Sequence, residues 1–85
     1  MIVTVVKDLA SRYTKAELEE AATAFETTRH NKLNVEGPDD GEKLSNLLAA
    51  IEIRARMDQG ASVTEALRDF SQRVRSIFNQ PKNRG

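Results

Sequence analysis

The segment from Leu44 to Met57 constrains the fold most, because as a helix it is apolar on two opposite sides. At about 100° per residue, the first side has the pattern expected of a core-facing stripe and holds Leu44, Leu47, Leu48, Ile51 and Ala55. The second side holds Ala50, Ile53 and Met57. A helix that is apolar on two sides must be covered twice. It is therefore either the central helix of its own domain or a helix shared with a second chain.

Because the chain is short, it has few residues with which to cover both apolar sides of this helix. A sequence of 85 residues forms one small domain, and domains of this size are marginally stable unless a disulfide, a metal or self-association adds to the core. The chain has no cysteine and a single histidine, His30, which excludes disulfides and argues against a zinc site. The remaining sources of stability are good packing between the helices or association into an oligomer.

Charge and hydropathy point to a protein of the cytoplasm. The first residues carry no basic lead and too short an apolar run for a signal peptide, and no apolar stretch is long enough to cross a membrane.

The net charge of the chain is zero, because its 13 basic and 13 acidic side chains cancel. Residues 61–85 hold five basic and two acidic side chains, hence +3, which leaves −3 on residues 1–60. This asymmetry is smaller than that of a dedicated nucleic-acid binder.

Helical periodicity covers most of the chain. Apolar residues at helical spacing predict helices over about 2–13, 15–29, 41–58 and 63–79. The run Ile2–Val6 is rich in β-branched residues and also suits a strand, but no partner strand is found elsewhere. We therefore expect a helix there. The second helix should bury Leu18, Ala21, Ala22 and Phe25; the last helix has one apolar band, made by Val63, Ala66, Leu67, Phe70, Val74, Ile77 and Phe78.

Local signals place the helix ends. Thr14 to Glu17 and Ser62 to Glu65 are capping boxes. Asp39 or Asp40 is the expected N-cap of the central helix, and Gly60 is its expected C-cap glycine. Between the second and third helices the apolar residues lose their helical spacing. We expect an extended loop there, with the side chains of Leu33 and Val35 packed against the core.

These elements predict an all-α, four-helix module with the hydrophobic helix in the centre. Short links favour antiparallel packing of neighbouring helices, which would pair the first helix with the second and the third with the last. The domain should span residues 1–80, and residues 81–85 should form a flexible, disordered tail.

No group of residues forms a catalytic signature. His30 lies at a predicted helix end, where a histidine commonly faces water or the terminal carbonyls. Glu52 and Arg56 are spaced for an ordinary ion pair. The acidic run Asp39–Glu42 lacks the ligand spacing of a calcium loop, and helix capping explains it. We expect no catalytic residue, no cofactor and no metal, although a ligand in a cavity of the bundle would be invisible at this level.

Two surfaces are candidates for binding. Ala50, Ile53 and Met57 could contact a partner protein or a second copy, since small side chains allow close helix approach and methionine adapts to irregular surfaces. The alternative is that the first helix covers them within the chain. A basic set could meet the phosphates of a nucleic acid and comprises Arg68, Arg75, Lys82 and Arg84. Glu65 and Asp69 in the same helix oppose that contact.

Several stretches of the second half of the chain resemble small, uncharacterised bacterial proteins of unknown function. The resemblance is carried by Gly41–Leu44, Leu47–Ile51, Met57, Gly60, Thr64–Arg68 and Arg73–Arg75. It implies a helical hairpin and brings no activity or ligand with it.

From the sequence we expect a non-enzymatic helical module that associates with itself, as a homodimer, or with another protein. A nucleic-acid-associated protein is the alternative. The partner, the pathway and the stoichiometry are left open by the sequence.

Overall fold

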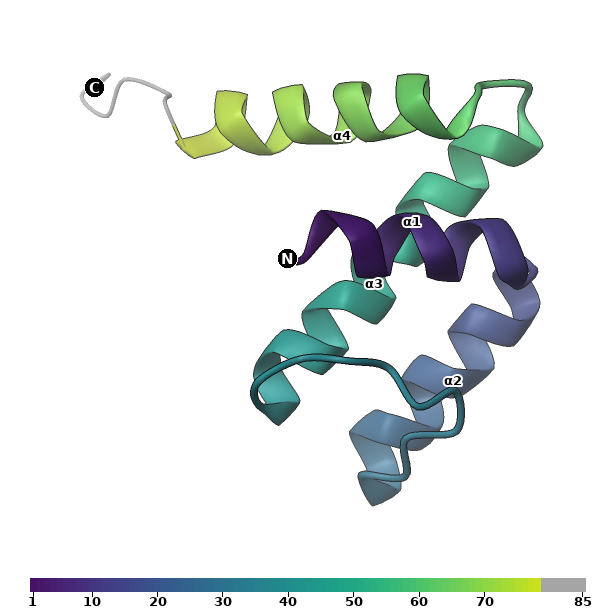
Figure 1. Ribbon diagram of the computed structural model, residues 1–85, viewed down its shortest axis with the longest axis vertical. Coiled ribbons are helices and arrows are strands. Elements are labelled where there is room, and N and C mark those ends of the chain that lie inside the picture. The colour runs from purple at the N-terminus through teal and green to yellow at the C-terminus, as the bar shows by residue number, and fades with distance from the viewer. Residues whose placement is uncertain (79–85) are drawn as a thin grey trace.

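The computed structural model describes the backbone of residues 1–78 and the side chains of residues 1–73 (Figure 1). It contains four helices: α1 (Val3–Arg12), α2 (Lys15–Thr28), α3 (Asp40–Asp58) and α4 (Val63–Phe78). The predicted all-α class is confirmed, and the helix boundaries agree within one residue. The expected tail, residues 81–85, lies outside the described residues.

The first segment is a helix and not a strand. Its buried side chains are Val6, Leu9 and Ala10, spaced as one side of a helix requires. Ile2, in front of the helix, has extended backbone. The strand preference of the β-branched residues in this segment is therefore outweighed by the contacts that one side of the helix makes with the core.

The predicted caps are present at three helix starts. Thr14 and Glu17 form a reciprocal capping box, with N···O distances of 2.8 and 3.1 Å. Ser62 and Glu65 form the second, at 3.0 and 3.1 Å. The hydrogen bond donated by the Ser62 backbone N–H also lowers the pKa of Glu65. The side chain of Asp39 accepts from the Glu42 N–H at 2.8 Å and so begins α3.

Gly60 ends α3 as predicted. Its φ is +110°, a conformation that glycine adopts without a Cβ penalty. The Gly60 N–H donates to the Met57 carbonyl and the Ala61 N–H to the Arg56 carbonyl, the two bonds of a Schellman motif. The chain thereby reverses between α3 and α4 within a few residues.

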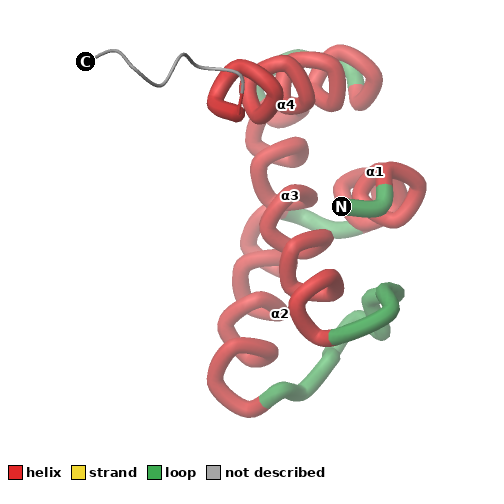
Figure 2. The backbone as a smooth tube through the Cα atoms, turned by 90° about the vertical axis from the view of Figure 1, so that its left-hand side faces the viewer, coloured by secondary structure: helices red, strands yellow, loops and turns green. Residues whose placement is uncertain are grey.

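Helix α3 is central, because it contacts each of the other three helices. Helices α2 and α3 run antiparallel, and α1 lies across them; α4 crosses the C-terminal end of α3 (Figures 1 and 2). The expected pairing of sequence neighbours was wrong for α1 and α2. The antiparallel pair is α2 and α3, joined by the longest loop, because each brings its apolar side to the other.

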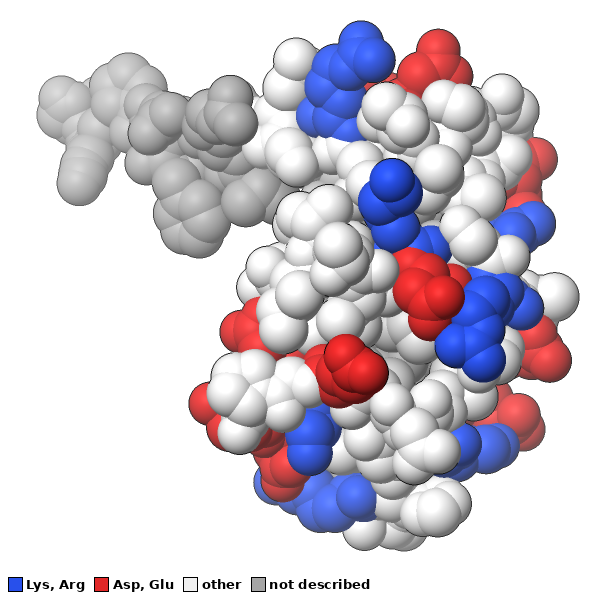
Figure 3. All heavy atoms as spheres, viewed as in Figure 1, with Lys and Arg blue, Asp and Glu red and all other residues white. Residues whose placement is uncertain are grey.

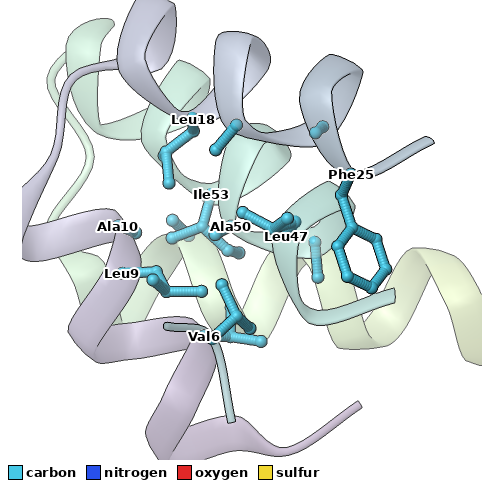
Figure 4. Packing of buried hydrophobic residues seen from close by; sticks show 13 residues of the cluster. Val6, Leu9, Ala10, Leu18, Phe25, Leu47, Ala50 and Ile53 are labelled. Atoms are coloured by element: carbon cyan, nitrogen blue, oxygen red, sulfur yellow. The ribbon is translucent and has the colours of Figure 1, made fainter. Parts of the chain in front are cut away.

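The core lies where α1, α2 and α3 meet (Figure 4). All four residues expected on α2 are buried. Opposite them lie Val6, Leu9 and Ala10 of α1, and Leu47, Ala50 and Ile53 of α3. Ala66 is the buried residue of α4 among its described side chains. On the same helix Val63, Leu67 and Phe70 are half-buried against this cluster, whereas Val74, Ile77 and Phe78 lie beyond the described side chains.

The loop between α2 and α3 is held by two asparagines. Asn31 accepts from the Val35 N–H at 2.8 Å and donates to the Val35 carbonyl at 3.0 Å. Val35 is buried and Leu33 is half-buried, as expected. Asn46 of α3, fully buried, accepts from the Ile2 N–H at 2.8 Å and donates to the Glu36 carbonyl at 2.9 Å. The Asn46 side chain thus connects α3 both to the start of α1 and to the loop that precedes α3.

Candidate functional site

The side of α3 that we expected to meet a partner is covered from within the chain. Ala50 and Ile53 are fully buried and lie among side chains of α1 and α2 (Figure 4). Met57 is half-buried against the same cluster. The alternative stated for this surface therefore holds for Ala50 and Ile53, which are core residues because α1 and α2 cover them.

The opposite side of α3 is the open one. Leu48 is 48% exposed, whereas Leu44, Ile51 and Ala55 are half-buried. We had expected all four in the core, and for Leu48 that prediction was wrong. These four residues, Leu44, Leu48, Ile51 and Ala55, are called the open stripe below. The helical period identified both apolar sides of α3 correctly, but it could not tell which side α1 and α2 would cover.

Charged side chains flank the open stripe and tie α4 to α3. The Glu52 carboxylate accepts from Arg56 at 3.3 Å, as the spacing predicted, and also from Arg73 of α4 at 3.2 Å. On the other flank, Arg54 pairs with Asp58 at 2.9 Å. Since Glu52 lies one helical turn after Leu48, the Arg73 contact places α4 about one turn from the most exposed residue of the stripe. The three arginines leave a positive excess at this end of α3.

The N-terminal end of α3 is acidic. Asp39 and Asp40 are exposed, and the Glu42 carboxylate pairs with the amino group of Met1. Asp39 is engaged as the N-cap, the role that the sequence suggested in place of a calcium ligand. Among the described residues, no three His, Asp or Glu side chains come close enough together to hold a metal ion.

A groove that the sequence did not indicate lies between α1 and the α2–α3 loop. Its volume is about 260 Å³, and its lining comprises Thr4, Val5, Asp8, Leu9, Arg12 and residues 33–36. Asp8 and Arg12 pair with each other at 2.9 Å across its wall, and this hydrogen bond raises the pKa of Arg12. This ion pair neutralises two of the three charged residues of the lining; the third is Glu36.

Of the remaining candidates, the structure describes the side chains of His30 and Arg68. His30 is exposed just after α2, and its backbone N–H donates to the Thr28 hydroxyl at 3.3 Å. Arg68 is exposed on α4. Arg75, Lys82 and Arg84 lie outside the described side chains, so the nucleic-acid alternative stays a prediction. On the face seen in Figure 3, acidic and basic side chains are interspersed, with uncharged residues between them.

Within residues 1–78, no helix has the length and apolar character needed to cross a membrane.

Fold and surface define a small all-α module with a central helix that is buried on one side and partly exposed on the other, most of all at Leu48. The chain belongs to a family of unknown function (DUF6952), which matches residues 1–79. The resemblance noted in the second half thus extends over the first half as well. No curated protein and no solved structure matches the chain.

Proposed function

We propose that this protein is a non-enzymatic association module and that its contact surface is the open stripe of α3. The observation that carries the proposal is Leu48. It is one of three large hydrophobic residues that are exposed among the described residues; the other two, Met1 and Val3, lie at the start of the chain. Leu48 lies in the middle of the central helix and continues a line of half-buried apolar side chains.

The physical argument is the cost of leaving this surface in water. Complete burial of an exposed leucine side chain contributes about 1.5–3 kcal/mol. Because Leu48 is 48% exposed, covering it contributes roughly half of that, and the apolar row beside it gains from the same cover. The absence of a catalytic signature in the sequence supports a role in binding and not in catalysis. The surface differs from the one first expected, but the reason for expecting association, a central helix with two apolar sides, is unchanged.

A photo-crosslinking residue at position 48 tests this proposal directly. In the native host, p-benzoylphenylalanine in place of Leu48 should yield an adduct of higher mass on irradiation. The matched control carries the same residue in place of Thr23, which is exposed on α2. Circular dichroism should show equal helicity for both variants. Equal adduct yields at the two positions, or no adduct from position 48, would contradict the proposal.

A further inference from the structure

The open stripe has the spacing of a surface that can pack against a copy of itself. Its residues follow one another at intervals of four, three and four, the pattern that keeps an apolar line on one side of a helix. Leu48 lies near the middle of α3, which spans Asp40–Asp58. A two-fold axis beside Leu48 would therefore align two such helices over most of their length, in antiparallel orientation.

Charge favours the antiparallel orientation over the parallel one. The start of α3 carries three carboxylates, of Asp39, Asp40 and Glu42, against the cations of Lys43 and the Met1 amino group. Near its end, three arginines (Arg54, Arg56 and Arg73) outnumber the two carboxylates with which they pair, those of Glu52 and Asp58. Asp40 lies eight residues before Leu48 and Arg56 eight residues after it. Antiparallel pairing about Leu48 thus brings the acidic end of one helix level with the basic end of the other, and parallel pairing would align like charges.

The charge of the whole chain does not oppose such pairing. Its net charge is zero at pH 7, so two copies approach without overall repulsion. The helix macrodipoles of two antiparallel α3 helices also oppose each other favourably.

From these observations we propose that the occupant of the open stripe is a second copy of this chain. The two α3 helices pack antiparallel, with Leu48 of each copy beside Leu48 of the other. This inference rests on the proposed function, because it names the partner for the same surface. The interface is isologous, so each contact occurs twice.

Single-cysteine variants test this geometry, because the chain has no cysteine of its own. Under mild oxidation Leu48→Cys should form a disulfide-linked pair, since the two positions would lie within the Cα separation of roughly 4.4–6.8 Å that a disulfide requires. Ala55→Cys, which lies in the open stripe, should not link to itself, because an antiparallel pair about Leu48 separates the two copies of this position by about 21 Å along the helix. A mixture of Gly41→Cys and Ala55→Cys should give the mixed pair, because these positions lie seven residues before and after Leu48 and within about 20° of its direction around the helix.

The mass in solution gives the second measurement. Light scattering on the unmodified chain should give twice the 9.5 kDa of a single copy, and Leu48→Lys should reduce the mass to that of a single copy with unchanged helicity. Self-linking of Ala55→Cys as readily as Leu48→Cys would overturn the antiparallel arrangement. A constant single-copy mass would overturn self-pairing altogether.

The two proposals can fail separately. If the crosslinker at position 48 captures a different protein while the purified chain keeps the mass of one copy, the open stripe is a binding surface but the second copy is not its occupant. If it captures nothing, both proposals fail.

Discussion

Asn46 is the buried polar side chain in the core of the described residues. Its two hydrogen-bond partners, the Ile2 N–H and the Glu36 carbonyl, are 44 and 10 residues away in the sequence. Sequence analysis gave Asn46 no role, because its role depends on segments that only the tertiary fold brings to it. Asn31 differs, since its partner Val35 is local.

Removal of the Asn46 carboxamide should be costly. We expect Asn46→Ala to lower the free energy of unfolding by about 1–3 kcal/mol, because it leaves the Ile2 N–H and the Glu36 carbonyl, which lie in part-buried hydrogen bonds, without these partners. Urea denaturation followed by circular dichroism measures the change. Ser45→Ala, at the exposed neighbouring position, is the control and should change stability by less than about 0.5 kcal/mol. Equal effects of the two substitutions would argue against the role of Asn46.

At the scale of the helices, sequence analysis succeeded because the signals are local. A capping box needs only residues three apart, and a C-cap glycine needs only the conformation of one residue. Thr14, Ser62 and Gly60 therefore all act where they were expected to. The position of α4 could not be predicted in this way. Its apolar band is visible in the sequence, but its place across the end of α3 depends on how Ala66, Leu67 and Phe70 pack against the core of the other helices.

Two glycines at the ends of α3 should respond to alanine in opposite ways. Gly60→Ala should destabilise the protein by about 1 kcal/mol, because φ is positive there and an L-residue is strained. Added atoms at Gly60 would meet nothing within 4 Å, so the cost arises from the backbone alone. Gly41→Ala, in the first turn of α3, should stabilise by about 0.4–1 kcal/mol through the unfolded state.

Thermal unfolding of both glycine variants and the unmodified chain compares these effects. At Gly41 a Cβ would lie 3.5 Å from an Asp39 carboxylate oxygen, an ordinary contact distance. A gain in stability at Gly60, or a loss at Gly41, would contradict the assigned end of α3.

For the whole molecule, the decisive property is which side of α3 faces inward. We expect Ile53→Ala to cost about 2–5 kcal/mol, because Ile53 is fully buried. Leu48→Ala should cost less than about 0.5 kcal/mol in the isolated chain, since Leu48 is half-exposed. Chemical denaturation at low protein concentration separates this effect from association. Similar losses for both variants would mean that both sides of α3 are buried within one copy.

The sequence alone determined the four helices, their caps, the buried side of α2 and the central place of α3, because each follows from local backbone preferences or from the period of apolar residues. It did not determine which apolar side of α3 is interior. Both sides have the same period, and the difference between them is the cover that α1 and α2 provide. The tertiary structure decided that cover through contacts between segments up to 44 residues apart. As a result, the exposed side of α3 is the one that carries Leu48 and not the one that carries Ile53.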